Sequence, residues 1–387
     1  MKKIAIITGE ASGDLYGGRL AKALKELSPN LELQGMGGFN MAEAGVNLIF
    51  DMTDLSGIGA LEVIAKIPKF FQRLKEVGNY LKGNKPQLLI LIDFPEFNMR
   101  LAKIANRLNI PTIYYIPPTA WAWRRGRAKT IAKSVDKVIS IFDFEAKVYQ
   151  EAGNEVEFVG HPLLDIAVAK MTKEEACKEF KLDAKKKIIG ILPGSRKKEI
   201  EVLLPIMLSS VEKIRNKFPD AQFILPLATT LSKDDVSYFF PLPSHLQVIE
   251  NNVYEVMNIS DLIIVASGTA TLEAACLGIP MIIVYKLNWL SWQLGRLLVS
   301  TGGFIGMPNI VAGKEIVPEL LQNRATPESI SQYAIGLLED EKKREEMSSK
   351  LRQVREKLGN SEATIRAAKT ILKHVFGLRS DSLREEE

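Results

Sequence analysis

The chain opens with Lys3-Ile-Ala-Ile-Ile-Thr-Gly-Glu-Ala-Ser-Gly-Asp14, a short apolar run that ends in a glycine-containing polar turn. We expect a buried strand over residues 4–8 and a helix over residues 13–27. The apolar run of four residues is too short for the apolar region of a signal peptide. The pattern is instead typical of the first strand and helix of a β-α-β unit.

The same alternation continues along the chain. Further strands are expected at residues 88–92, 112–116, 138–141, 156–159, 187–192, 222–226, 247–250, 262–266 and 281–285. Helical patterns separate many of them, near residues 100–108, 144–151, 199–217 and 269–277. Almost wholly apolar strands are typical of parallel sheets that are covered on both faces. We therefore predict an α/β protein with doubly wound sheets.

A restart of the pattern near residue 187 predicts two similar domains. We expect domains over residues 1–165 and 166–355, followed by a charged helical segment over residues 356–387. Near the start of the second domain, Thr172 and Glu175 have the spacing of a helix capping box. No apolar run approaches the roughly 20 residues that span a bilayer.

Composition narrows the class of protein further. The 387 residues are 46% hydrophobic and 25% charged, which excludes a disordered chain, a collagen and a coiled-coil rod. The two cysteines lack CxxC spacing, so a reducing compartment is favoured. Three histidines, far apart in the sequence, argue against a histidine metal site.

The net charge of +5 is unevenly distributed, because residues 61–137 carry 15 Lys and Arg against 5 Asp and Glu. Such a basic segment predicts an anionic partner. Within residues 56–82 apolar side chains recur at spacings of three and four, with Lys and Arg interleaved, and Pro68 is expected to kink or split the helix. This helix either packs on its domain or lies in a membrane interface. Phe70 and Phe71 beside four cations favour the membrane.

Two turns in the second half carry groups that suit a nucleotide. Gly194, Ser195 and Arg196 follow one expected strand and open a helix, which is typical of a diphosphate cradle. A Walker A motif is absent from the sequence. The turn Ser267-Gly268-Thr269 is also expected to face phosphate, and Glu273 to accept hydrogen bonds from a ribose. Helix capping and surface charge are the alternative interpretations of both turns.

The first half offers acids and a tryptophan-arginine segment. Asp93 ends an apolar strand, where a carboxylate is a candidate general base, with Glu96 as a second acid. Capping of the following turn is the alternative. Residues 116–127 hold two Trp and three Arg, which stack on bases, contact phosphate or lie at lipid headgroups. Buried Trp beside solvated Arg is the competing interpretation.

Together these motifs resemble the lipid-A-disaccharide synthase family, inverting glycosyltransferases of the GT-B class. The resemblance extends from residues 9–14 to residues 308–313, and residues 10–14, 92–98 and 121–124 are its most specific parts. It implies two Rossmann-like doubly wound domains with an interdomain cleft. It also implies that UDP-2,3-diacylglucosamine and 2,3-diacylglucosamine 1-phosphate (lipid X) react to the β-1,6-linked lipid A disaccharide 1-phosphate and UDP, with no cofactor and no metal.

The motifs and the resemblance together assign roles to residues, and the roles of Asn309, Ser12 and Glu10 come from the resemblance. Asp93 is the expected base, with Glu10 beside it in the catalytic group. The expected UDP-sugar ligands are Ser12, Gly194, Ser195, Arg196, Ser267, Gly268, Thr269, Glu273 and Asn309. The expected acceptor and membrane contacts are Ile64, Ile67, Lys69, Phe70, Phe71, Arg73, Trp123 and Arg124. The implied location is cytoplasmic, at the inner face of the inner membrane of a Gram-negative-type bacterium. The C-terminal helix either crosses back to the first domain or exchanges between the protomers of a homodimer.

Two other functions are weighed against this one. A non-hydrolysing UDP-N-acetylglucosamine 2-epimerase shares the GT-B architecture but needs no acceptor and no lipid-facing surface, so the basic segment argues against it. A nucleotide-sugar-binding or RNA-binding protein is the non-enzyme alternative. The modest net charge of +5 and the lack of a nucleic-acid motif argue against nucleic acid as a partner.

Overall fold

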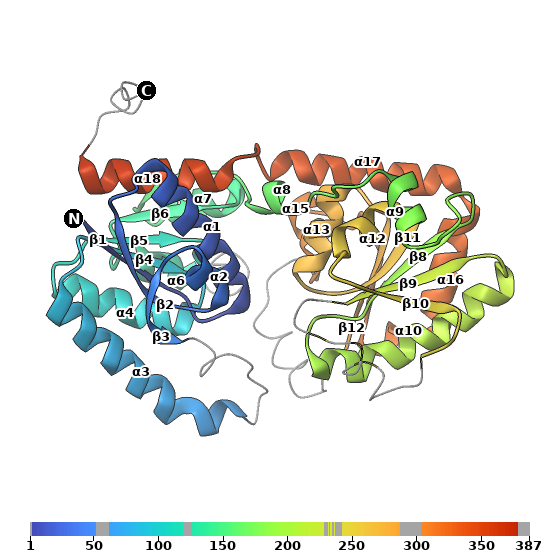
Figure 1. The fold of residues 1–387 in the computed structure, drawn as a ribbon, viewed down its shortest axis with the longest axis horizontal. Coiled ribbons are helices and arrows are strands. Elements are labelled where there is room, and N and C mark those ends of the chain that lie inside the picture. Colours follow the sequence, from blue (N-terminus) through green and yellow to red (C-terminus); the bar gives the residue numbers. More distant parts are fainter. Residues whose placement is uncertain are drawn as a thin grey trace. The chain divides into compact units, whose positions relative to one another are not determined.

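A computed structural model describes residues 2–51, 62–118, 125–227, 242–286 and 303–377, together with residues 231, 233 and 236. Side chains are described within these ranges except at residues 62–66 and 125. The chain forms two compact units, drawn in Figure 1. Unit 1 comprises Met1–Pro162 and Leu358–Glu387, and unit 2 comprises Leu163–Lys357.

Unit 1 is built on a parallel sheet of seven strands in the order β3-β2-β1-β4-β5-β6-β7. The strands are β1 (Lys3–Ile7), β2 (Glu32–Gly37), β3 (Asn47–Asp51), β4 (Leu88–Ile92), β5 (Thr112–Tyr115), β6 (Lys137–Ser140) and β7 (Glu155–Phe158). The apolar runs of β1 and β4 pair in register, with Ile4 opposite Leu88 and Ile7 opposite Leu91. These central strands are almost completely buried, as expected for parallel strands with helices on both faces.

Helices cover both faces of this sheet. They are α1 (Ala11–Leu27), α2 (Phe39–Glu43), α3 (Glu62–Asn84), α4 (Pro95–Arg107), α6 (Arg125–Ala132), α7 (Asp143–Glu151) and α18 (Ala363–Phe376). One face forms a core in which Leu89 and Leu91 of β4 pack with side chains of α3, α4 and α6. Ile90 and Ile92 point the other way, toward the face where α1 lies, and α18 runs beside α1 there (Figure 1).

Unit 2 repeats the plan with six parallel strands in the order β10-β9-β8-β11-β12-β13. The strands are β8 (Ile188–Leu192), β9 (Gln222–Leu227), β10 (Leu246–Glu250), β11 (Leu262–Ala266), β12 (Met281–Tyr285) and β13 (Glu319–Leu321). The helices are α8 (Leu163–Ile166), α9 (Lys173–Glu179), α10 (Lys197–Lys217), α12 (Val253–Ile259), α13 (Thr269–Leu277), α15 (Met307–Ala312), α16 (Pro327–Glu339) and α17 (Glu341–Lys357), with a 3₁₀ turn at Gln322–Arg324. Helices α10 and α16 pack together, whereas α12 and α13 pack with α9 and α17. The prediction of two doubly wound α/β domains is therefore confirmed.

Local differences from the sequence expectations have physical reasons. Helix α4 begins at Pro95, earlier than expected, because the first turn of a helix tolerates a proline that lacks an N–H. Helix α3 continues through Pro68, so this proline does not split it. The predicted capping box is confirmed, since Thr172 and Glu175 exchange both hydrogen bonds. None of the described helices is long and apolar enough to cross a membrane.

The chain leaves unit 1 after Pro162 and returns to it at Leu358. These two segments of unit 1 lie against each other. The His161 N–H donates to the Leu358 carbonyl at 2.8 Å, and a Cβ on Gly359 would lie 3.1 Å from the Cα of Gly160. The Arg366 guanidinium donates to the carbonyls of Val159 and Asn360 at 2.9 and 2.6 Å. Burial lowers the pKa of His161 to about 3, so the ring stays neutral and acts in packing.

Candidate functional site

In unit 1 the candidate site lies where the strand order reverses, between β1 and β4. Ligands of open α/β sheets bind at such a point, outside the carboxyl ends of the strands. The two loops there approach so closely that a Cβ on Gly9 would lie 2.4 Å from the ring of Phe94. A Cβ on Gly13 would lie 2.0 Å from the Thr8 hydroxyl. Glycine at position 9 therefore allows the two loops to meet, and glycine at position 13 allows the first turn of α1 to lie against Thr8.

This approach brings Ser12 to Asp93. The Ser12 hydroxyl donates to Asp93 Oδ2 at 3.4 Å. Burial raises the pKa of Asp93 above its ordinary value, and hydrogen bonds from the Phe94 N–H and from Ser12 oppose that rise. A partly buried carboxyl group with a raised pKa is a suitable proton acceptor.

The backbone of Asp93 is fixed by two side chains that sequence reasoning missed. Asp93 and Phe94 have φ values of +50° and +48°, a left-handed conformation that non-glycine residues rarely adopt. The Asp93 carbonyl accepts hydrogen bonds from Asn98 Nδ2 at 2.8 Å and from the Tyr114 hydroxyl at 2.7 Å. Both donors are buried, so they hold the strained turn in one conformation.

The other acids of unit 1 differ in their surroundings. Asp14 is buried and accepts four hydrogen bonds, including those from the backbone N–H groups of Gly38 and Asn40 at 2.7 and 2.9 Å. It therefore holds the first turn of α2. Glu96 is exposed and pairs with Arg100 and Arg127. Glu10 is exposed at the N-cap position of α1, where its side chain makes no capping hydrogen bond.

Unit 2 places its polar turns at the matching reversal, between β8 and β11. After β8, Gly194 has a φ of +118°, and Ser195 and Arg196 are exposed at the start of α10. Glu199 contacts both, because its carboxylate accepts from the Ser195 N–H at 3.2 Å and from Arg196 Nη1 at 3.3 Å. A carboxylate of the same helix therefore already accepts hydrogen bonds from these two donors.

After β11, Ser267 is partly buried, and Gly268 and Thr269 are exposed at the start of α13. The Glu273 side chain, one turn further along α13, accepts a hydrogen bond from the Tyr254 hydroxyl at 3.1 Å. Burial raises the pKa of Glu273 above its ordinary value, and the hydrogen bond from Tyr254 opposes this. The turn at residues 267–269 thus leads directly into α13, the helix that carries the Glu273 carboxylate, as the sequence spacing predicts. The tyrosine was not predicted.

Asn309 is fully buried in unit 2, and its side-chain amide forms hydrogen bonds with neighbouring groups. Its Oδ1 accepts from the N–H groups of Ile316 and Val317 at 2.7 and 3.0 Å. Its Nδ2 donates to the Val317 carbonyl at 2.9 Å and to Glu319 at 2.8 Å. Because these bonds occupy the amide, we assign Asn309 to holding the loop around α15 in place. Its predicted contact with the nucleotide stays a prediction.

The expected lipid-facing helix presents both exposed and inward side chains. Ile67 and Phe71 are 45% and 51% exposed, and Lys69 is exposed beside them; we call these three residues the α3 face. Phe70 is partly buried, with its ring 5.4 Å from that of Phe97. Arg73 pairs with Glu76 at 3.1 Å. Trp123, Arg124 and the side chain of Ile64 lie outside the described residues.

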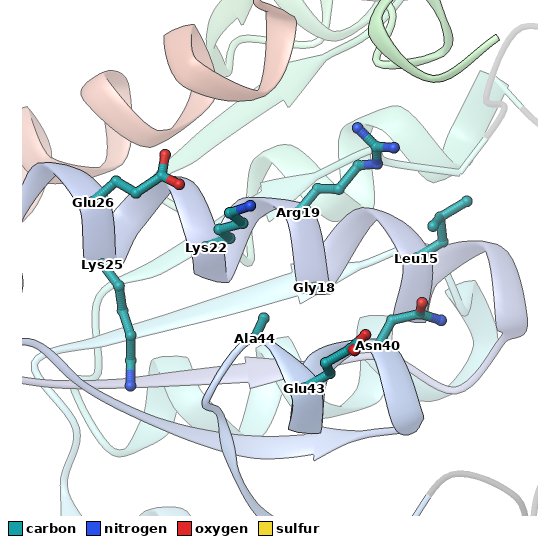
Figure 2. A pocket seen from close by; sticks show the side chains of 9 residues that line it. All are labelled: Leu15, Gly18, Arg19, Lys22, Lys25, Glu26, Asn40, Glu43 and Ala44. Atoms are coloured by element: carbon teal, nitrogen blue, oxygen red, sulfur yellow. The ribbon is translucent and has the colours of Figure 1, made fainter. Parts of the chain in front are cut away.

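A cavity of about 830 Å³ lies on unit 1 between α1 and α2. Its lining includes Arg19, Lys22 and Lys25. Figure 2 shows that Arg19 and Lys25 point to different sides of α1, so these cations do not converge on one anion. Among the described residues, no cluster of three or more His, Cys, Asp or Glu side chains is arranged to hold a metal ion.

Comparisons with known proteins give matches over nearly the whole chain. A family model described as Lipid-A-disaccharide synthetase matches residues 4–375. A lipid-A-disaccharide synthase of Geobacter sulfurreducens is 41% identical over 371 residues, which cover 96% of each chain.

Two solved structures share the fold at low identity. The UDP-GlcNAc 2-epimerase of Neisseria meningitidis, bound to UDP-GlcNAc, has a TM-score of 0.64 at 15% identity, covering 96% of this chain and all of the other. The calicheamicin glycosyltransferase CalG4 has a TM-score of 0.63 at 12% identity, covering 98% of this chain and 99% of the other. These structural similarities show a GT-B fold. At such low sequence identity they do not indicate the activity of this chain.

The buried contacts of Asp14 lead to a stability prediction. Asp14→Ala leaves the N–H groups of Gly38, Asn40 and Met41 without their acceptor, and we expect a loss of about 2–4 kcal/mol in the free energy of unfolding. Urea unfolding followed by circular dichroism measures it. Asp143→Ala, which removes an exposed ion pair with Lys147, is the control and should cost about 0.5 kcal/mol or less. Equal losses in the two variants would contradict the role of Asp14.

Proposed function

The chain belongs to the lipid-A-disaccharide synthase family, and on that premise we propose how this glycosyltransferase selects and joins its substrates. The donor is UDP-2,3-diacylglucosamine and the acceptor is 2,3-diacylglucosamine 1-phosphate. The acceptor 6-hydroxyl attacks the anomeric carbon of the donor while the bond from that carbon to the diphosphate oxygen breaks. The products are the β-1,6-linked disaccharide 1-phosphate and UDP.

Asp93 is the base in this proposal, and the observation that supports it most is its environment. The carboxyl is partly buried, its pKa is raised, and it lies at the strand-order reversal of unit 1 with the Ser12 hydroxyl at 3.4 Å. In its ionised form it accepts the proton of the acceptor hydroxyl as the new bond forms. Glu96 is less suited, because it is exposed and its carboxylate already pairs with Arg100 and Arg127. We place Glu10, exposed on the neighbouring loop, in contact with the acceptor sugar.

Unit 2 holds the donor nucleotide in this proposal. The N–H groups at the start of α10, the Ser195 hydroxyl and the Arg196 guanidinium stabilise the charge that develops on the departing diphosphate. Gly194 lets the backbone approach the phosphates. Ser267, Gly268 and Thr269 contribute from the start of α13, and Glu273 binds the ribose. The diphosphate replaces Glu199 as the acceptor of the Ser195 and Arg196 hydrogen bonds.

We also propose that the enzyme attaches peripherally to the inner face of the inner membrane. Both substrates carry two acyl chains, so they reside in or near lipid. The α3 face offers two exposed apolar side chains beside Lys69, and the surrounding segment 61–137 carries a charge of +10, from 15 basic and 5 acidic residues. Apolar insertion together with attraction to anionic lipid is the usual basis of such attachment.

The first test concerns the base. Asp93→Asn should lower kcat by about 10²- to 10⁴-fold, because the amide cannot accept the proton. Ser12→Ala removes a hydrogen bond that lowers the pKa of Asp93, so the acid limb of its pH–rate profile should move to higher pH. Release of UDP at fixed substrate concentrations measures both. UDP affinity is the folding control, and near-normal turnover of Asp93→Asn would remove the assignment.

The second test concerns the leaving group. Arg196→Ala should weaken UDP binding by about tenfold or more, since a charge-assisted hydrogen bond is lost, and should lower kcat. Isothermal titration with UDP and with uridine separates this effect from general damage, because uridine has no phosphate. Equal weakening for both ligands would contradict a role at the diphosphate.

The third test concerns the membrane. The triple variant Ile67→Ser, Lys69→Ser, Phe71→Ser should bind anionic phosphatidylglycerol vesicles about tenfold more weakly, because apolar area and one cation are removed. Phe70 is left intact, since its ring packs inside unit 1. Phe39→Ser is the matched control, because Phe39 is 76% exposed on α2 rather than α3. If the triple variant co-sediments with vesicles as the wild type does, the α3 face does not contact lipid.

A further inference from the structure

Tyr254 contacts the carboxylate that we propose as the ribose ligand. Tyr254 is the second residue of α12, which follows β10, whereas Glu273 lies on α13, which follows β11. The Tyr254 hydroxyl donates to Glu273 Oε1 at 3.1 Å. The two helices pack against each other, so the contact joins side chains held by neighbouring elements of unit 2.

The carboxylate needs such a donor. Glu273 is partly buried, and a buried carboxylate is costly unless hydrogen bonds satisfy it. A glutamate side chain also has several rotatable bonds, and fixing it costs conformational entropy when a ligand binds. A hydroxyl that already holds one oxygen removes part of that cost before the nucleotide arrives.

The bond also determines which acceptor sites remain. An ionised carboxylate has about four lone-pair sites, and Tyr254 uses one of them on Oε1. The second oxygen, Oε2, keeps its acceptor capacity for a ligand. Two adjacent ribose hydroxyls are donors of the right kind, because each contributes one O–H.

We infer that Tyr254 is a positioning residue of the nucleotide site: its hydroxyl fixes Glu273 so that the carboxylate accepts hydrogen bonds from the ribose hydroxyls, which makes the enzyme selective for ribonucleotides. The inference rests on the proposed function, in which Glu273 binds the ribose. It adds a residue on α12 to a site otherwise built from the turns after β8 and β11. Tyr254 does not contact the reacting atoms in this account.

The alternative is that Tyr254 only fills space between α12 and α13. In that case loss of the hydroxyl affects every ligand equally, or none. Selectivity between ligands that differ only in the ribose hydroxyls separates the two cases, because a purely structural change does not recognise those hydroxyls.

The experiment measures dissociation constants of UDP and 2′,3′-dideoxy-UDP by isothermal titration with the full-length protein. Four proteins are compared: wild type, Glu273→Gln, Tyr254→Phe and Tyr333→Phe. Tyr254→Phe removes only the hydroxyl and keeps the ring, so the packing is preserved. Tyr333→Phe is the matched control, because Tyr333 lies on α16 of the same unit and is 40% exposed.

We expect the wild type to bind UDP more tightly than the dideoxy analogue by about tenfold or more, as for a charge-assisted hydrogen bond. Glu273→Gln should lose most of this preference. Tyr254→Phe should reduce the preference about threefold or more, with unchanged affinity for the dideoxy analogue, and its turnover defect should appear mainly in the KM for the donor. Tyr333→Phe should match the wild type.

Two results would overturn the inference in distinguishable ways. If wild type and Glu273→Gln behave as expected but Tyr254→Phe keeps the full preference, or loses affinity equally for both ligands, Tyr254 does not position the carboxylate and the proposed ribose site stands. If the wild type shows no preference, or Glu273→Gln retains it, the ribose role of Glu273 fails and the role of Tyr254 fails with it.

Discussion

Both units depend on the same constraint, the reversal of strand order in a parallel sheet. A right-handed crossover from β1 places the next strands on one side, and the chain then returns to add β4 on the other side. The helices that follow β1 and β4 cover opposite faces of the sheet, so the turns that lead into them lie side by side at its carboxyl edge. In unit 2 the loops after β8 and β11 are placed in the same way. The side chains that contact the substrates in our proposal, apart from those of α3, follow these four strands, and Tyr254 reaches them from α12.

The acids of this protein show that position in the fold decides what a carboxylate does. Asp14 and Glu319 are buried and bonded to backbone N–H groups, so they stabilise loops. Glu199 lies against a guanidinium and a helix N-terminus, where an exchange of anions is easy. Burial raises the pKa of Asp93, Glu273 and Glu319 alike, but three hydrogen bonds oppose the rise at Glu319, whereas two do so at Asp93 and one at Glu273. Such poorly compensated groups are typical of functional sites.

The fold was predictable from sequence because each central strand is a continuous apolar run followed at once by a polar turn. That signal is local, and it is sufficient to locate Asp93, Ser195 and Ser267 at strand ends. The contacts between those turns are not local. The approach of Gly9 to the Phe94 ring depends on the pairing of β1 with β4, which no single segment encodes.

The sequence alone also could not identify residues that act by positioning other residues. Tyr254 reaches Glu273 only because α12 and α13 pack together. The amide of Asn309 faces inward, yet a polar residue next to a proline looks the same in sequence whether it faces a ligand or a loop. On α3, the spacing of apolar residues could not separate Phe70, which packs inside, from Phe71, which is exposed.

The return of the chain to unit 1 has a consequence for synthesis. Unit 1 is discontinuous, because α18 packs beside α1 although nearly the whole sequence separates them. On α18, Ala367, Ala368 and Ile371 are completely buried, so their partners stay uncovered until α18 has left the ribosome. Unit 2 is continuous in sequence and meets no such delay. The order of translation therefore favours completion of unit 2 first, and a nascent chain whose α18 has not yet emerged leaves unit 1 with an open apolar face.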